Sequence, residues 1–198
     1  MKNYLCLNGK KIELTPEQVQ SLVGESGYDV SLDESGEIAR IGKYEFIVLK
    51  HTDEGVHLLL KTSLGDMSFG DTNDFRTSDI KRRLEEFADE LASIIGAENI
   101  VEHTVDLTAD DGLKDYGTTT ARVSLLTADM YREHVYTIDK YKLDDWWWLV
   151  TPFSTLTHGY ERAVKCVAPS GYIINYSSGN FNVGVRPFWI LKSDIFVS

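Results

Sequence analysis

Hydrophobic and polar residues alternate along several short stretches of the chain, and this period of two predicts β-strands. Residues 3–14 carry apolar residues on both sides of Asn8-Gly9, which supplies the positive φ angles of a tight hairpin turn. Residues 38–61 contain three such stretches, IARI, YEFIVLKH and VHLLLK, separated by turn residues. The first third of the chain is therefore expected to hold a hairpin and a three-stranded meander.

Helical spacing is clearest in the segment that follows residue 77. Between a capping Ser78 and a terminating Gly96, apolar residues recur every three or four positions along one face. These residues are Ile80, Leu84, Phe87, Ala88, Leu91, Ile94 and Ile95. A second helix is expected from about Ala128 to Tyr141, with Thr127 as its cap.

A short helix is also expected close to the start of the chain. Thr15 would be its N-cap, Pro16 suits the first helical position, and Gly24 is placed to end it. Together with the preceding hairpin, this helix would form an appendage over residues 1–35. Residues 36–198 would then form the core domain.

The remaining segments favour strands joined by loops rich in Gly, Ser and Asn. The expected strands are ARVSLL at residues 121–126, WWWLV, AVKCVA, YIINY, FNVGV and FWILK. Residues 97–120 read instead as an acidic, turn-rich connection. Many strands with two helices and no internal repeat predict an α+β domain of mostly antiparallel strands.

The net charge limits the classes of partner. The 198 residues carry a formal charge of −11, from 31 acidic and 20 basic side chains, which repels phosphate backbones and anionic lipids. Neither nucleic acid nor a membrane is therefore expected as a partner. The first residues lack a signal-peptide pattern, and no run approaches the roughly 20 apolar residues of a membrane helix. Only Cys6 and Cys166 are present, which fits a reducing cytoplasm.

Three consecutive tryptophans, Trp146 to Trp148, need a physical explanation. In a strand, Trp146 and Trp148 would share one face while Trp147 occupies the other. Burial of each indole removes on the order of 150 to 250 Å² of surface from water. A role in the core is therefore favoured, and a stacking platform for a sugar or peptide is the alternative.

The segment GVRPFWILK at residues 184–192 suggests an interior anchor. Gly184 permits close backbone approach, Pro187 holds Arg186 extended, and the guanidinium presents five donors in a rigid fork. We expect Arg186 to hold loop carbonyls or an interior carboxylate rather than a ligand.

The order of these motifs resembles a family of uncharacterised domains from bacteriophages and gut bacteria. That family often reads Trp-Trp-Leu-Arg-Ser-Pro, then Val-x-x-x-Gly, then Gly-Val-Arg-Pro-Ala, and this chain reads WWWLVTPF, AVKCVAPSGYI and NVGVRPFWILK. The resemblance covers roughly residues 38–192, with Val150-Thr151 where the family has Arg-Ser. The matching positions are Trp148, Pro152, Gly171, Gly184, Val185, Arg186 and Pro187.

The resemblance implies a C-type-lectin-like core, the fold of formylglycine-generating enzymes and of variable receptor-binding proteins of some phages. It also implies a phage or prophage origin, with the protein in the cytoplasm of a bacterial host or associated with a virion. It implies no catalytic residues. The positions expected to act as structural anchors are Trp146, Trp148, Pro152, Gly184, Arg186 and Pro187.

Local signatures of catalysis and metal binding are weak in this sequence. Formylglycine-type catalysis uses a cysteine pair or a copper site, whereas Cys166 lies in an apolar strand pattern typical of a buried, inert thiol. The stretch VDLTADDGLKD departs from the EF-hand spacing, so Asp110, Asp111 and Asp115 are interpreted as a solvated loop. None of the five histidines has a triad signature. We expect no metal and no cofactor.

Two loops are the candidates for function: residues 154–162, STLTHGYER, and residues 176–182, YSSGNFN. Their aromatics supply contact area, and their Ser, Gly and Asn residues adapt hydrogen bonds, although plain exposed turns share this composition. The leading hypothesis is a non-enzymatic binding module that recognises a protein or glycan. Its ligand-binding residues would be His158, Tyr160, Arg162, Asn180 and Phe181.

Two other functions remain open. The first is a small-molecule enzyme, for which the sign would be a deep pocket lined by several of Asp144, His158, Glu161 and Cys166. The second is an intracellular inhibitor of a host defence protein that mimics nucleic-acid charge through its acidic surface. The sequence leaves the oligomeric state open.

Overall fold

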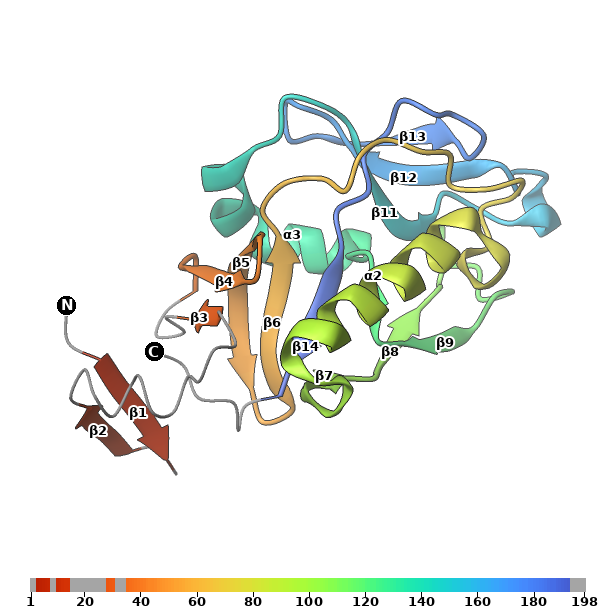
Figure 1. Cartoon of the computed structure of the whole chain (residues 1–198). Coiled ribbons are helices and arrows are strands. Elements are labelled where there is room, and N and C mark those ends of the chain that lie inside the picture. The colour runs from red at the N-terminus through yellow and green to blue at the C-terminus, as the bar shows by residue number, and fades with distance from the viewer. Residues whose placement is uncertain (1–2, 8–9, 15–27, 31–34, 193–198) are drawn as a thin grey trace.

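The computed structural model describes residues 3–7, 10–14, 28–30 and 35–192 of the chain. Within these ranges the protein has two α-helices and mostly antiparallel strands, which confirms the α+β class (Figure 1). The predicted hairpin is present as β1 (Asn3–Leu7) paired with β2 (Lys10–Leu14). The helix predicted between Thr15 and Gly24 lies outside the described residues.

The largest sheet contains the predicted meander. Its strand order is β10-β14-β6-β5-β4-β3, and β7 also pairs with β14. The bounds are β3 (Tyr28–Val30), β4 (Ile38–Ile41), β5 (Tyr44–Thr52), β6 (Gly55–Leu60), β7 (Ile100–Val101), β10 (Val123–Ser124) and β14 (Phe188–Leu191). The first residue of β6, Gly55, has no room for a side chain, because a Cβ atom there would overlap the backbone carbonyl of Leu191 on β14.

Two helices cover the sheet, and alternate residues of β5 face them. Phe46 belongs to the same hydrophobic cluster as Phe87 of α2 (Asp79–Ile95), whereas Ile47 belongs to the cluster of Tyr131 of α3 (Ala128–Ile138). The predicted N-caps are confirmed: Ser78 accepts from the Lys81 amide, and Thr127 accepts from the Met130 amide. The core is therefore split into an α2 side and an α3 side.

A second sheet, with the order β11-β12-β13, carries the tryptophans. Its strands are β11 (Trp147–Pro152), β12 (Ala163–Val167) and β13 (Ile173–Ser177). Trp148 packs on the α2 side against Phe69, and Trp147 packs on the α3 side against Tyr131. Both are almost fully buried, at 0% and 2% exposure, so these two indoles are core residues, as favoured from the sequence.

Several predicted element boundaries were wrong. The connection over residues 97–120 contains η2 (Ala97–Asn99), β7, β8 (His103–Asp106) and most of β9 (Thr118–Ala121), and β8 pairs with β9. The strand predicted over 121–126 is split between β9 and β10. The strand predicted over 181–185 is reduced to isolated bridges from Gly184 to Trp147 and Asp66.

The second helix is shorter than predicted, because after Ile138 the chain tightens into the 3₁₀ turn η3 (Asp139–Tyr141). Two further 3₁₀ turns are η1 (Phe75–Thr77) before α2 and η4 (Leu156–His158) between β11 and β12. Neither described helix has the length and apolarity required to cross a bilayer.

Candidate functional site

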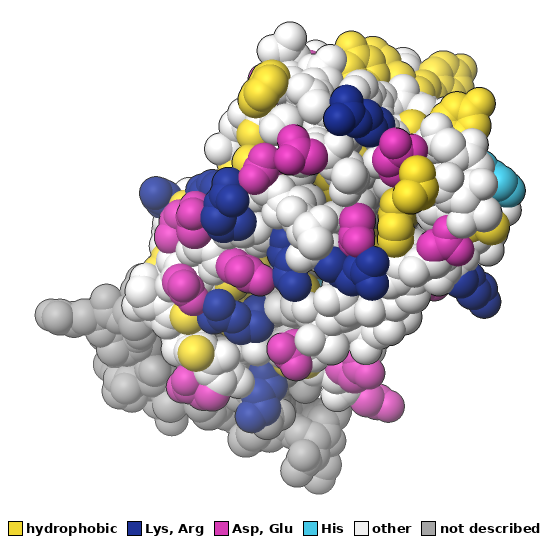
Figure 2. All heavy atoms as spheres, turned by 90° about the vertical axis from the view of Figure 1, so that its right-hand side faces the viewer, with side chains coloured by type: hydrophobic (Ala, Val, Ile, Leu, Met, Phe, Trp, Pro, Cys, Tyr) yellow, Lys and Arg dark blue, Asp and Glu magenta, His cyan; other side chains and the backbone are white. Residues whose placement is uncertain are grey.

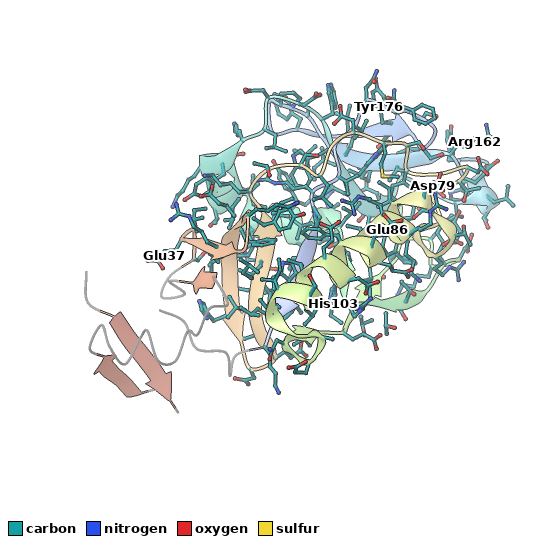
Figure 3. The ribbon with its side chains drawn as sticks, in the orientation of Figure 1. Glu37, Asp79, Glu86, His103, Arg162 and Tyr176 are labelled. Carbon is teal, nitrogen blue, oxygen red and sulfur yellow. The ribbon has the colours of Figure 1, made fainter. Side chains whose placement is uncertain are left out.

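The two candidate loops lie side by side at one end of the β12-β13 pair. The register places Ala163 opposite Ser177, and the backbone N–H of Ser178 donates to the carbonyl of Arg162 at 2.8 Å. Arg162 and Tyr176 accordingly project from the same end of the molecule (Figure 3). We call this end the loop face, defined as residues 154–162 and 176–182.

Of the large hydrophobic side chains exposed in the described part of the chain, Leu156, Tyr160, Tyr176 and Phe181 belong to the loop face, and Tyr136 and Tyr172 lie outside it. Leu156, Tyr160 and Phe181 are 69%, 54% and 71% exposed. Hydrophobic side chains gather toward the upper end of the molecule in Figure 2. Soluble proteins usually keep such large apolar side chains scattered, so a group of them identifies a candidate interaction surface.

Aromatic neighbours support the exposed rings from below. Tyr160 meets Phe153 edge to face with ring centroids 5.4 Å apart. Tyr176 lies 5.7 Å from Trp146, which is half-buried against the α2 side of the core. Trp146 is thus the only member of the tryptophan run that reaches the loop face. The rings of Tyr160 and Tyr176 therefore pack against aromatic neighbours, whereas Phe181 is 71% exposed.

The first loop is fixed by Asn73, a fully buried residue between β6 and η1. Its side-chain nitrogen donates to the carbonyls of Ser154, Tyr160 and Ala163 at 2.8, 3.0 and 2.8 Å. Its side-chain oxygen accepts from the Tyr116 hydroxyl at 2.7 Å. Sequence reasoning missed Asn73, because nothing in the polar stretch around it indicates contacts more than 80 residues away.

The acidic segment 107–117 also holds this loop. Asp115 accepts from the hydroxyls of Thr155 and Thr157 at 2.5 and 2.6 Å. Asp111 accepts from the Ser154 hydroxyl at 2.5 Å and contacts Nδ1 of His158 at 2.9 Å. Asp110, Asp111 and Asp115 are exposed, as expected of a solvated loop, but the carboxylates of Asp111 and Asp115 also bind the first candidate loop, which the sequence did not indicate.

Ser154, His158 and Asp111 meet, but they do not have the geometry of a catalytic triad. In a triad the serine and the carboxylate bind opposite nitrogens of the imidazole. Here both Ser154 and Asp111 approach the same atom, Nδ1 of His158, at 3.3 and 2.9 Å. Ser154 is moreover only 1% exposed, and its hydroxyl donates its proton to the Asp111 carboxylate in a hydrogen bond. This cluster positions His158 and does not activate a nucleophile.

Hydrogen bonding lowers the pKa of both loop-holding carboxyls. For Asp111 the main cause is the Ser154 hydroxyl, and for Asp115 it is the Thr155 hydroxyl, followed by that of Thr157. Both carboxylates are ionised at neutral pH, and the ionised form is the better acceptor. The loop is therefore held by charge-assisted hydrogen bonds.

A third aspartate joins the acidic segment to the second sheet. The Lys165 ammonium, in a buried side chain of β12, binds Asp110 at 3.0 Å and the Asn175 side-chain oxygen at 2.8 Å. Arg132 of α3 also binds Asp110, at 3.0 Å. Burial acts to raise the pKa of Asp110, but hydrogen bonds from Lys165 and Arg132 outweigh it, so the pKa is lowered.

The second loop is held mainly by its backbone. The Ser178 carbonyl accepts from the amides of Phe69 and Gly70, and the Asn180 side chain accepts from the Asn182 amide at 2.8 Å. Phe181 is left exposed at the tip. The structure thus brings His158, Tyr160 and Arg162 to one end of the β12-β13 pair together with the loop of Asn180 and Phe181.

The expected anchors lie in the interior, apart from the half-buried Trp146. Arg186 is fully buried, and its guanidinium donates to the carbonyls of Leu60, Lys61 and Tyr141 at 2.7, 3.0 and 3.1 Å. Gly184 has room for no side chain, because a Cβ atom would come within 2.7 Å of the Ser63 hydroxyl. Pro152 and Pro187 are buried as well. These positions support the sheet beneath the loop face.

Thiol chemistry has no support from Cys166. The side chain is fully buried on the α2 side of the core, and burial raises the pKa of its thiol to about 12. The thiolate is therefore not populated at neutral pH. Within the described ranges, no three His, Cys, Asp or Glu side chains are grouped so that they could hold a metal ion.

Comparisons with protein-family models, curated proteins and solved structures each found no match. The functional argument for this chain therefore rests on its own geometry. That geometry consists of two adjacent loops with exposed aromatic side chains, one of them held by a buried asparagine and two ionised aspartates.

Proposed function

We propose that this protein is a non-enzymatic binding module that recognises a protein or a glycan through the loop face. The observation that carries the proposal is the exposure of Tyr160 and Phe181 on loops that lie side by side. Aromatic rings supply large contact area at low entropic cost, and rigid support keeps that cost low. His158, Arg162 and Asn180 add polar groups around the rings.

The support beneath the loop is the second argument for recognition. A plain solvent-exposed turn has no need of a buried asparagine that binds two of its carbonyls and that of the next residue, Ala163, or of two carboxylates that bind its hydroxyls. Such support is what a binding surface requires, because a preordered loop loses less conformational entropy on association.

The proposal extends to the origin and fold family of the chain. The motif order WWWLVTPF, AVKCVAPSGYI and NVGVRPFWILK resembles domains of phages and gut bacteria, and we propose a C-type-lectin-like core of phage or prophage origin. The mixed sheet-and-helix architecture is compatible with it. Within that proposal, the variable loops of the fold are the natural place for recognition.

Charge mimicry of nucleic acid has less support than the loop face. On α2, Arg82 pairs with Asp79, and Arg83 pairs with Glu86 and Glu90. Basic and acidic side chains are mixed over the face in Figure 2 instead of forming a continuous acidic strip. A mimic of the phosphate backbone would need such a strip.

The test is a double substitution on the loop face. Wild-type protein is screened against a glycan array and a bacterial lysate, and each ligand recovered is then titrated with the Tyr160→Ala/Phe181→Ala variant. We expect affinity to fall at least about tenfold, since aromatic hot spots each contribute roughly 1 to 2 kcal/mol. The melting temperature should change by no more than about 2 °C, because both side chains are exposed.

The matched control is Tyr136→Ala. Tyr136 is 87% exposed on α3, away from the two loops, so its loss should leave both binding and stability unchanged. Retained binding by the double variant, or equal loss in the control, would show that the loop face is not the recognition surface.

A further inference from the structure

The three-stranded sheet has one edge that no described residue covers. Its order is β11-β12-β13, so β11 and β13 are its outer strands. On the β11 side, the amide of Trp148 donates to the carbonyl of Gly184, and the amide of Val150 donates to the carbonyl of Leu126. Among the described residues β13 pairs only with β12, and it lies at the top of the molecule in Figure 1. The outer edge of β13 is therefore open to another chain.

The register decides which backbone groups of β13 point outward. Opposite residues of an antiparallel ladder alternate between pairs that exchange hydrogen bonds and pairs that do not. Just beyond the two ends of β13, Tyr172 accepts from the Ala168 amide and the Ser178 amide donates to Arg162, at 2.9 and 2.8 Å. From either end, every second residue of β13 therefore turns its N–H and C=O away from β12. These residues are Ile173, Asn175 and Ser177.

The outward groups lack partners within the described residues, apart from one carbonyl. The Ser177 carbonyl accepts from the Asn180 amide at 3.0 Å, as part of a turn. The N–H and C=O groups of Ile173 and Asn175, and the N–H of Ser177, form no hydrogen bond with the described part of the chain. They make a row of donors and acceptors that repeats at every second residue. The backbone of another strand matches this spacing.

β13 also lacks the features that usually keep an edge strand from pairing. Natural edges commonly carry charged side chains, a proline or a bulge. The sequence of β13, IINYS, contains no charged residue and no proline. Its register with β12 is continuous, whereas the register of β11 with β12 shifts between Trp148 and Pro152. Pairing with another chain is therefore unopposed at this edge.

The side chains beside the edge suit an apolar strand. Tyr176 is 36% exposed, and its ring centroid lies 5.7 Å from that of Trp146. Ile174 shares a face of β13 with Tyr176 and packs against the same side of the core as Trp146. Beyond the two ends of the strand, Tyr172 and Phe181 are 74% and 71% exposed. An added strand thus meets apolar side chains along one face and at both ends.

We propose that β13 binds an extended segment of a partner protein, which joins the β11-β12-β13 sheet as a further antiparallel strand. This inference rests on the proposed function and deepens it, because it assigns the loop face to a protein segment rather than to a glycan. A sugar chain has no backbone of alternating donors and acceptors at strand spacing. A second copy of this chain is disfavoured, because each copy carries a formal charge of −11 and the two repel each other.

The register also predicts the sequence pattern of the bound segment. A residue that bonds to the outward backbone of Asn175 places its two neighbours opposite Ile174 and Tyr176. These are non-hydrogen-bonded pairs, in which opposite side chains approach most closely. Aromatic and β-branched residues are the favourable cross-strand partners of Tyr176 and Ile174. The bound segment is therefore expected to carry two such residues separated by one position.

Peptide selection followed by titration tests the proposal. Random peptides of about seven residues, an ordinary strand length, are selected on the wild-type protein, and the tightest binder is synthesised and titrated by calorimetry. We expect its sequence to contain two aromatic or β-branched residues separated by one. N-methylation of the peptide residues whose N–H faces β13 should weaken binding at least about tenfold, whereas N-methylation of the intervening residues should change it less than about twofold.

A matched pair of variants tests the same contact from the side of the protein. Asn175→Pro removes an outward N–H that β12 does not use, and proline is tolerated at such edge positions. Asn175→Ala keeps this N–H and, like the proline variant, loses the side-chain bond to Lys165. Binding of the selected peptide should be at least about tenfold weaker to Asn175→Pro than to Asn175→Ala. The melting temperatures of the two variants should agree within about 3 °C.

Failure of this inference is distinguishable from failure of the proposed function. If no peptide is selected, or if binding ignores both N-methylation and Asn175→Pro, strand addition is wrong. Loss of that binding in Tyr160→Ala/Phe181→Ala would still leave the loop face as the recognition surface. If the peptide requires the Asn175 N–H but binds the double variant unchanged, strand addition stands and the proposed roles of Tyr160 and Phe181 fail.

Sedimentation of the wild-type protein and of Asn175→Pro decides between a partner protein and a second copy. We expect both to be monomers over the concentration range of the titrations. A wild-type dimer that the proline variant loses would assign the edge of β13 to a second copy and overturn the proposal.

Discussion

The side-chain amide of Asn73 donates to the backbone carbonyl of Tyr160 at 3.0 Å, across 87 residues of sequence. This bond joins the segment after β6 to the first candidate loop, which lies between β11 and β12 and carries the exposed ring of Tyr160. Two further bonds from the same nitrogen, to Ser154 and Ala163, fix both ends of that loop. The geometry of the loop face therefore depends on a residue outside it.

Asn73→Ala should strongly destabilise the protein. It removes four hydrogen bonds, which should lower the free energy of unfolding by about 3 kcal/mol. The carbonyls of Tyr160 and Ala163 keep the backbone amides of Ala163 and Phe153 as donors, whereas the Ser154 carbonyl loses the donor from Asn73. Urea denaturation at neutral pH measures the change. Asn180→Ala is the control and should cost no more than about 0.5 kcal/mol, because Asn180 makes its side-chain hydrogen bond within its own loop. Equal costs for the two variants would contradict the central role of Asn73.

Local patterns in the sequence predicted the elements whose stability comes from one continuous face. The period of α2, its cap at Ser78 and the meander of β4 to β6 all follow from neighbours in sequence. The alternation of Trp147 and Trp148 between two sides of the core was predictable for the same reason. A strand that is buried on both faces carries large apolar residues at successive positions, and this pattern is visible in the sequence.

Other features could not be predicted, because their cause lies far away in sequence. Thr118 and Thr120 of β9 are exposed and polar, so the strand has little apolar pattern and depends on its pairing with β8. No residue close to Asn73 in sequence indicates its four hydrogen-bond partners. The segment around Gly184 has the composition of a strand but is pressed between Trp146 and Ser63, which leaves only isolated bridges. Tertiary packing decides all three cases.

Asp115→Asn should reduce the sensitivity of the protein to acid. The pKa of Asp115 is lowered in the folded state by the Thr155 and Thr157 hydroxyls, so its contribution is present above the pKa of the unfolded chain. That contribution is lost as the pH falls through the folded pKa. Thermal melts at pH values from about 5 to about 2 should show a smaller decline for the variant than for wild type. An unchanged decline would mean that Asp115 does not hold the loop.

His57 should make stability depend on pH in a higher window. Burial lowers the pKa of His57 to about 4, and the nearby Lys50 acts in the same direction. Between about pH 6.5 and about pH 4 the unfolded chain therefore binds a proton at His57 that the folded protein does not. The free energy of unfolding accordingly decreases by roughly 2 kcal/mol as the pH is lowered through this window. His57→Gln should reduce this fall in urea denaturation, while His51→Gln, at an exposed position of β5, should not. If both variants keep the wild-type slope, His57 is not the cause.

Gly184→Ala should destabilise the support of the loop face through steric overlap. The new Cβ atom would lie 2.7 Å from the Ser63 hydroxyl and 3.2 Å from the Trp146 carbonyl, at a cost of about 1 to 3 kcal/mol. Ser63→Ala in the same chain removes the nearer atom and should restore part of the stability. A double-mutant cycle by urea denaturation measures this coupling. Additive effects would show that Gly184 is required for another reason.

Hydrogen exchange on the wild-type protein, with and without the ligand recovered by the glycan and lysate screens, tests the central claim most directly. If the loop face is the recognition surface, protection on binding is concentrated in the backbone amides of residues 154–162 and 176–182, with α2 unchanged. Protection centred on the charged surface of α2, with both loops exchanging as in the free protein, would contradict the account and favour recognition through charge.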